Sequence, residues 1–176
     1  MKKITLISAM LVLFTGISLS AAPRILIASY SWSGNTRFAA QQIQKAVGGT
    51  LWEITPVKPY PKDYKKCVAQ ARKETKAKFK PELTAAPDLS KYDVVFIGSP
   101  NWCGTIAPPV ATFASDPALK GKKVYLFITH GRGGLQRCVT DFTALGIKPA
   151  AAVGFPGKDI KKSGSKIAAW AKKCMK

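Results

Sequence analysis

Five short apolar runs alternate with helix-like segments along most of this 176-residue chain, and no other feature constrains the fold as strongly. The clearest runs are RILIASY (24–30), YDVVFIG (92–98) and KVYLFIT (123–129). Uninterrupted, β-branched runs of this kind are typical of strands buried on both faces of a parallel sheet. The alternation therefore predicts an α/β domain with right-handed crossovers and helices on both faces of the sheet.

The other elements have weaker patterns. Strands are expected over 51–55 and 147–155, and helices over 37–47, 62–79, 109–114, 135–145 and 160–174. A chain of this length, of which 47% is apolar, provides one well-formed core and is too short for two ordinary domains.

The first 22 residues have the layout of a secretory signal peptide. Lys2 and Lys3 precede a mostly apolar run over 4–19, which ends in the small residues 20–22. A transmembrane anchor is the alternative, but it needs about 20 predominantly apolar residues, and polar residues interrupt this run. We expect a signal peptide over 1–22 and one domain over 23–176, periplasmic or secreted, with no transmembrane segment in the mature chain. The cleavage site stays open.

The chain is strongly basic, with a net charge of +19, and Lys2 and Lys3 are the only charged residues of 1–22. Such a charge attracts anionic surfaces, acidic proteins or nucleic acid at long range and says nothing about the fold. The lysines are dispersed, and no basic run is interleaved with aromatic residues as in a nucleic-acid reader. Nucleic acid is therefore not expected as a partner.

A polar loop, SWSGNT, joins the first strand to the first helix. It consists of Ser31, Trp32, Ser33, Gly34, Asn35 and Thr36. A phosphate at such a point meets free backbone N–H groups, the positive end of the helix dipole and hydroxyl donors. A plain helix cap at Ser33 or Asn35 is the alternative, but a cap needs one such side chain and this loop has four.

Two other phosphate-binding patterns are missing from this loop. No lysine follows a glycine as in G-x-x-x-x-G-K-[ST], and the dinucleotide fingerprint G-x-G-x-x-G does not occur here. A loop with hydroxyls and no lysine suits a monophosphate bound without a metal.

Three segments in the same order resemble the flavodoxin family. SWSGNTR resembles the family's S/T-x-S/T-G-N-T phosphate loop, YPKDYKKCVAQARKE with the following KPEL resembles the segment after strand two, and GSPNWCGTIAPPV resembles a GxPxWWGxxAPP loop. The resemblance implies a flavodoxin-like, three-layer, doubly wound, five-stranded parallel sheet of strand order 2-1-3-4-5, with FMN at the point where the order reverses.

The resemblance also implies two loops around the isoalloxazine ring. Counted after the phosphate loop, the second loop contains Pro100, Asn101, Trp102, Cys103, Gly104 and Thr105, and the third loop contains His130, Gly131, Arg132 and Gly133. Trp102 is expected against the ring, with core packing as the alternative. Arg132 departs from the family pattern, and a cation near the ring implies a less reducing flavin. His130 is expected to hydrogen-bond backbone, with proton donation to a substrate as the alternative.

Cys103 also departs from the family, which often has a second tryptophan there. In the implied strand order Cys103 and Cys138 come within disulfide reach, and an exported location permits such a bond. Free thiols are the alternative. Cys67 and Cys174 are expected on helices on opposite faces of the sheet, which disfavours their pairing.

The function we expect from the resemblance is that of an electron-transfer flavodoxin outside the cytoplasm, with FMN as cofactor. An FMN-dependent reductase of a quinone or another small acceptor is one alternative, and a flavin-free binding module is the other. No catalytic residue or metal ligand is assigned, and no nicotinamide site is recognised. Flavodoxins are usually acidic, so this basic chain is expected to meet an acidic redox partner or an electron donor at a membrane surface.

Overall fold

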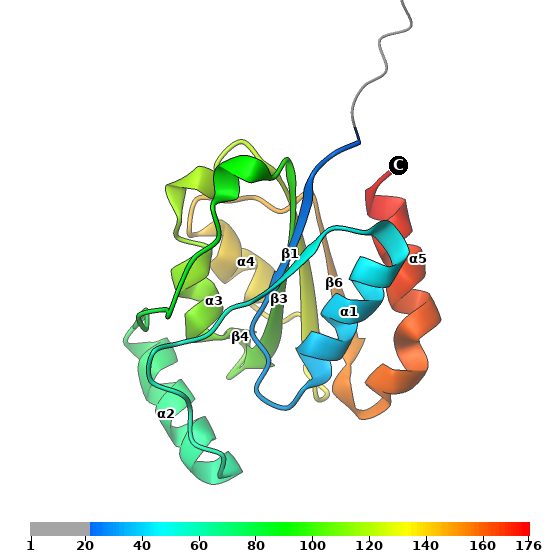
Figure 1. Cartoon of the computed structure of the whole chain (residues 1–176). Coiled ribbons are helices and arrows are strands. Elements are labelled where there is room, and N and C mark those ends of the chain that lie inside the picture. Colours follow the sequence, from blue (N-terminus) through cyan, green and yellow to red (C-terminus); the bar gives the residue numbers. More distant parts are fainter. Residues whose placement is uncertain (1–21) are drawn as a thin grey trace, which may run out of the picture.

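A parallel sheet forms the middle layer of the computed structural model, which describes residues 22–176 (Figure 1). Its parallel strands are β1 (Ile25–Ser29), β2 (Thr50–Glu53), β3 (Val94–Trp102), β5 (Lys123–His130) and β6 (Ala151–Pro156). Their order, β2-β1-β3-β5-β6, is the predicted 2-1-3-4-5 once the strands are counted in sequence. One strand was not predicted: the two-residue β4 (Thr105–Ile106), which pairs antiparallel with the end of β3.

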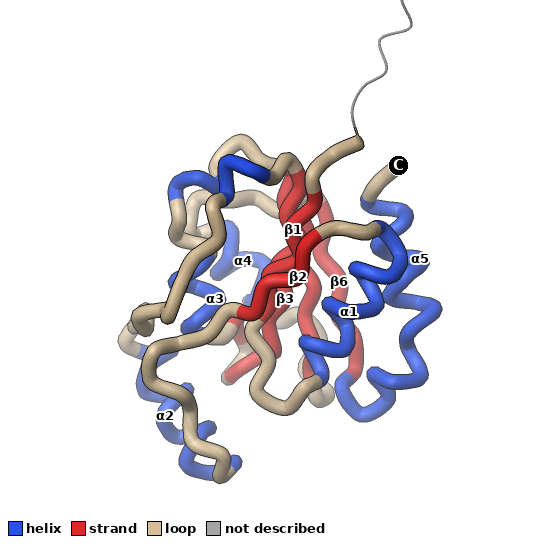
Figure 2. Tube along the Cα trace, viewed as in Figure 1, coloured by secondary structure: helices blue, strands red, loops and turns tan. Residues whose placement is uncertain are grey.

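Helices cover both faces of this sheet, as Figure 2 shows. On one face α1 (Asn35–Val47) packs against α5 (Gly164–Cys174), and on the other lie α2 (Tyr64–Lys76), α3 (Pro108–Phe113) and α4 (Cys138–Thr143). Short 3₁₀ turns occupy Leu89–Lys91, Pro117–Leu119 and Gly157–Ser163. None of the helices between residues 22 and 176 has the length and apolar character of a membrane span. The signal peptide predicted for 1–22 lies, apart from Ala22, outside the described residues.

The core consists of two apolar clusters, one on each side of the sheet. Along β1, Ile25 and Ile27 face the cluster under α1 and α5, whereas Leu26 and Ala28 face the other cluster. All five residues of β1 are buried. Because successive strand side chains point to opposite faces and both faces are covered, the strand has to be apolar without interruption.

Three predicted elements begin three or four residues later than the sequence indicated. The strand expected from 147 begins at Ala151, since Pro149 has no N–H to donate to the ladder. The helix expected from 135 begins at Cys138, because Gln136 has a φ of +42°. The helix expected from 160 begins at Gly164, after a 3₁₀ turn in which Asp159 is not helical.

Helix α2 ends three residues before the predicted position. The N–H of Lys78 donates to the carbonyl of Thr75 at 3.1 Å, and that of Phe79 donates to Glu74 at 2.9 Å. Together these bonds form a Schellman motif, in which the residue after the cap is left-handed. Here that residue is Lys78, with a φ of +51°, in a position that glycine usually occupies.

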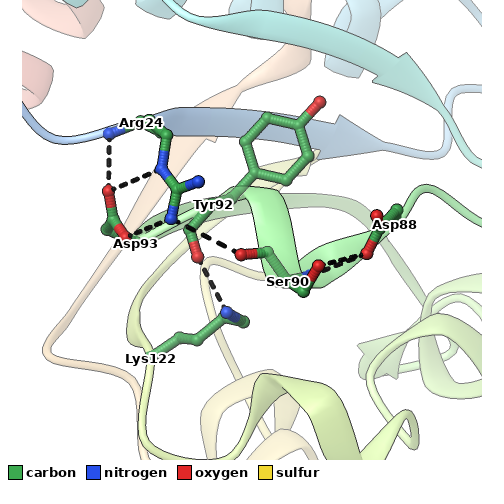
Figure 3. Close-up of polar contacts among 6 residues, drawn as sticks. All are labelled: Arg24, Asp88, Ser90, Tyr92, Asp93 and Lys122. Atoms are coloured by element: carbon green, nitrogen blue, oxygen red, sulfur yellow. Dashed lines mark hydrogen bonds and ion pairs between the residues drawn. The ribbon is translucent and has the colours of Figure 1, made fainter.

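Polar contacts connect the amino ends of the three central strands (Figure 3). The guanidinium of Arg24 donates to Asp93 at 3.0 Å, and the backbone N–H of Arg24 donates to the same carboxylate at 2.9 Å. Nearby, the ammonium of Lys122 donates to the carbonyl of Tyr92 at 2.7 Å. These contacts hold the starts of β1, β3 and β5 together and leave the carboxyl ends of the strands for a site.

We predict that Asp93→Asn reduces the loss of stability in acid. Arg24 lowers the pKa of Asp93 to about 2 through a hydrogen bond from its side chain, a hydrogen bond from its backbone N–H and its positive charge. A carboxylate with a lowered native pKa stabilises the fold above its unfolded pKa of about 4, and this contribution is lost as the pH falls towards 2. The urea concentration at the midpoint of unfolding should therefore fall less between pH 7 and pH 2 in Asp93→Asn than in the wild type. Arg24→Gln, which removes the cation, should show the same smaller fall. An unchanged fall in both variants would contradict the assignment.

Candidate functional site

The phosphate loop leaves the N-terminus of α1 open. Gly34 is the N-cap, with φ +88° and ψ −14°, and within residues 22–176 no side chain caps this end. The first intrahelical bond runs from the N–H of Phe38 to the carbonyl of Gly34 at 2.9 Å, so the N–H groups of residues 35–37 have no partner within the helix. The space beside Gly34 where a Cβ would stand is free of atoms within 4 Å. This arrangement suits an anion better than the plain cap at Ser33 or Asn35.

Two side chains of the loop already contact distant parts of the chain, one at a strand end and one at a 3₁₀ turn. Thr36 is buried, and its hydroxyl lies 2.8 Å from that of Thr129 at the end of β5. The amide of Asn35 lies close to Gly157, where an added Cβ would come within 2.6 Å of it. Ser33 is exposed and Ser31 is half-buried. The hydroxyls of Ser31 and Ser33, with the helix N–H groups, are therefore the freest donors for a phosphate.

The second predicted loop is a tight hairpin between β3 and β4. Its two turn residues, Cys103 and Gly104, have φ values of +53° and +89°. Positive φ at both central positions is the pattern of a type I′ turn, which favours glycine. Asn101 stabilises the hairpin from inside, since its side-chain oxygen accepts from the N–H of Gly104 at 3.0 Å.

Asn101 also connects this hairpin to the third loop. Its amide donates to the carbonyl of Gly134 at 2.8 Å and to the side-chain oxygen of Gln136 at 3.0 Å. The N–H of Arg137 donates to the carbonyl of Gly104 at 2.9 Å. With the contact between Thr36 and Thr129, these bonds bring all three predicted loops together at the carboxyl ends of the strands.

Aromatic side chains form one side of this region. Trp102 is half-buried and makes edge contacts with Tyr30 and Tyr60, at ring-centre distances of 5.4 and 4.8 Å. The Trp102 ring packs against the buried residues of the core, and part of its surface remains exposed. Burial, followed by a hydrogen bond to Glu74, raises the pKa of Tyr60 well above its usual value, so its hydroxyl stays protonated.

Trp32 lines a hollow beside the phosphate loop. Its indole N–H donates to the carbonyl of Pro61 at 3.0 Å, which holds the ring against the segment after β2. The hollow has a volume of about 240 Å³, and Tyr30, Ser31 and Tyr60 also line it. Trp32 thus lies where a planar ring bound near the phosphate loop would meet it.

The third loop begins at His130, the last residue of β5. Its imidazole packs on Gly154 of β6, where an added Cβ would lie 3.1 Å from Nε2. Its Nδ1 is buried and has no hydrogen-bond partner among the described residues. A buried polar atom without a partner is uncommon, and a bound ligand can supply one. Gly131, Arg132 and Gly133 are exposed.

The structure has free thiols, the alternative to the predicted pairing of Cys103 with Cys138. Cys103 and Cys138 are free thiols in the structure, as are Cys67 and Cys174. Cys103 is exposed at the tip of the hairpin, whereas Cys138 is fully buried in the core. A disulfide between them would require one of the two side chains to change its environment, so the structure does not support this predicted bond.

Sequence reasoning missed several residues that organise the site. Thr129, Gln136 and Gly157 were not singled out, although they contact the predicted loops. Thr129 had a weak signal, as a polar residue at the end of an apolar strand. Gln136 and Gly157 had none, because they act through contacts with distant parts of the chain. The described residues contain no cluster of three or more His, Cys, Asp or Glu placed to hold a metal.

The fold and the three loops define a doubly wound α/β protein with an uncapped helix N-terminus where the strand order reverses, between β1 and β3. A family model described as flavodoxin matches residues 24–174. The chain therefore belongs to the flavodoxin family.

Solved structures agree with this membership. A protein from Bacteroides eggerthii DSM 20697 classed as a flavoprotein is 29% identical, covers 84% of this chain and 99% of its own, and has a TM-score of 0.69. A second from Bacteroides uniformis ATCC 8492 is 26% identical over 86% and 99%, with a TM-score of 0.75. A flavoprotein from Lactobacillus acidophilus NCFM, solved in complex with FMN, is 26% identical over 80% and 98%, with a TM-score of 0.67. Among curated proteins no match is found.

We predict that Thr36→Val weakens FMN binding more than Thr129→Val does. In the hydroxyl pair Thr36 can accept from Thr129 and keep its own O–H for a phosphate. Both variants break the pair, but only the first removes a hydroxyl from the phosphate loop. Losing a hydrogen bond to a charged group costs about 1.5–3 kcal/mol, or roughly 10- to 100-fold in affinity. Quenching of FMN fluorescence on titration with each variant gives the dissociation constants. Equal losses would mean that the pair only supports the loop.

We predict that Cys103 is alkylated far faster than the other cysteines in the native protein. Burial, and next the charge of Asp141, raises the pKa of the Cys138 thiol to about 12, so at neutral pH it is protonated as well as inaccessible. Iodoacetamide labelling followed by mass spectrometry should show one fast site, and four sites after unfolding. A protein with only two reactive thiols after unfolding would contain a disulfide.

Proposed function

We propose that this chain binds FMN and carries electrons outside the cytoplasm. The observation that carries the proposal is the uncapped N-terminus of α1 at Gly34, where backbone N–H groups are available to a phosphate. Membership of the flavodoxin family and a relative of known structure in complex with FMN support the choice of cofactor. When bound, FMN supplies the redox chemistry, and the protein supplies binding, orientation and electrostatics.

The residues present fit this group. The N–H groups of residues 35–37, with Ser31 and Ser33, would hold the phosphate. Trp32 and Trp102 offer aromatic surfaces for a planar ring. His130 has a buried Nδ1 that lacks a partner among the described residues, and it would hydrogen-bond a polar edge of the ring. No step of the proposal needs a residue to form a covalent bond.

Charge supports the choice of partner. The net charge of +19, to which Lys2 and Lys3 of the predicted signal peptide contribute only two, steers the protein towards acidic surfaces, and association driven by such steering weakens steeply with salt. Arg132 in the third loop is exposed and adds a positive charge near the proposed ring. The signal-peptide layout of residues 1–22 supports export. An acidic redox protein, or an electron donor at an anionic membrane surface, is therefore the partner we propose.

Anaerobic reduction of the FMN-loaded protein tests this function. We predict tight binding of FMN, and during stepwise reduction the long-wavelength absorbance of one-electron-reduced flavin should accumulate. Riboflavin, which lacks the phosphate, should bind much more weakly. Reduction that passes directly to the two-electron state would favour the reductase of a quinone or another small acceptor, and failure to bind FMN would favour the flavin-free binding module.

A further inference from the structure

A groove lies on the face of the molecule that carries α2, α3 and α4. Its volume is about 530 Å³, within the usual range for sites that bind small molecules. Its apolar lining includes Ile106, Pro108, Ala111 and Leu145. Because Ile106 belongs to β4, the groove adjoins the hairpin of the second loop.

Positive charges surround this apolar lining. Lys78 and Lys80 follow the end of α2, and Arg137 precedes α4. The one carboxylate among the lining residues, Asp141, lies 3.4 Å from the guanidinium of Arg137 and therefore offsets that charge. Lys78 and Lys80 therefore give the groove an excess of positive charge. A ligand that matches both features has an apolar body and a single negative charge.

A buried donor points to the same conclusion. Thr75 is one of the lining residues, and its hydroxyl is buried and has no hydrogen-bond partner among the described residues. Thr75 lies in the last turn of α2, three residues before Lys78. Buried hydroxyls in native proteins almost always have a partner, and a bound oxygen atom would provide one.

Lys78 occupies its position at a conformational cost. Its φ of +51° places it where glycine would be less strained, yet the chain has a lysine there. Residues that cost stability without a structural benefit are often retained for binding. The lysine side chain is exposed at the edge of the groove.

We propose that this groove binds a small amphiphilic carboxylate. The apolar body contacts Ile106, Ala111 and Leu145, and the carboxylate lies near Lys78 and Lys80. None of the residues that line this groove belongs to the phosphate loop, and the proposal does not depend on FMN binding.

Calorimetric titration of the FMN-loaded protein with 2-naphthoate tests the proposal, and 2-naphthalenemethanol serves as its uncharged counterpart. We predict saturable binding of one naphthoate and at least tenfold weaker binding of the alcohol. The double variant Lys78→Gly with Lys80→Gln should weaken naphthoate binding at least tenfold. Because glycine relieves the strain at position 78, this variant should unfold at the same temperature as the wild type or at a higher one.

Two further variants locate the site. Lys65→Gln with Lys66→Gln removes the same charge from the opposite end of α2 and should change the affinity less than twofold. Ala144→Trp, at an exposed position lining the groove, should abolish binding while leaving FMN binding intact. Equal losses in the two lysine pairs, equal binding of acid and alcohol, or undiminished binding by Ala144→Trp would overturn the proposal.

Discussion

The position of β1 in the sheet is the constraint on which the site depends. Strand β1 pairs with β2 on one side and β3 on the other, and the chain leaves β1 towards α1 but leaves the β3–β4 hairpin towards α3 on the opposite face. The two connections therefore diverge, and a crevice forms at the carboxyl ends of the strands. The uncapped N-terminus of α1 faces that end. Without this reversal of strand order, Gly34 would start an ordinary helix.

Polar contacts join strands and loops at both ends of an apolar sheet. At the amino ends, Arg24 and Asp93 hold β1 to β3. At the carboxyl ends, the hydroxyls of Thr36 and Thr129 join the first and third loops, and Asn101 joins the second to the third. Loops held in this way need little rearrangement to bind a ligand, which lowers the entropic cost of binding.

The sequence predicted the central strands well, because a strand covered on both faces has to be continuously apolar, and the strand order followed from the resemblance to flavodoxins. It predicted the three site loops as well, since their polar residues follow those strands. It could not reveal the β4 hairpin, which is two residues long, or the contacts of Asn101 with Gln136, which join positions 35 residues apart. The pairing of Cys103 with Cys138 was expected because the two residues follow neighbouring strands. That position does not reveal which way each side chain points, and in the structure one thiol is exposed and the other is buried.

The central claim is that a flavin phosphate binds at the N-terminus of α1. The most direct test is an amide NMR titration of the ¹⁵N-labelled protein with FMN, and in parallel with riboflavin. Our account predicts that FMN produces the largest changes at the N–H groups of Asn35, Thr36 and Arg37, and that riboflavin leaves these signals nearly unchanged. Binding of FMN that leaves these three signals in place, or equal changes with riboflavin, would contradict it.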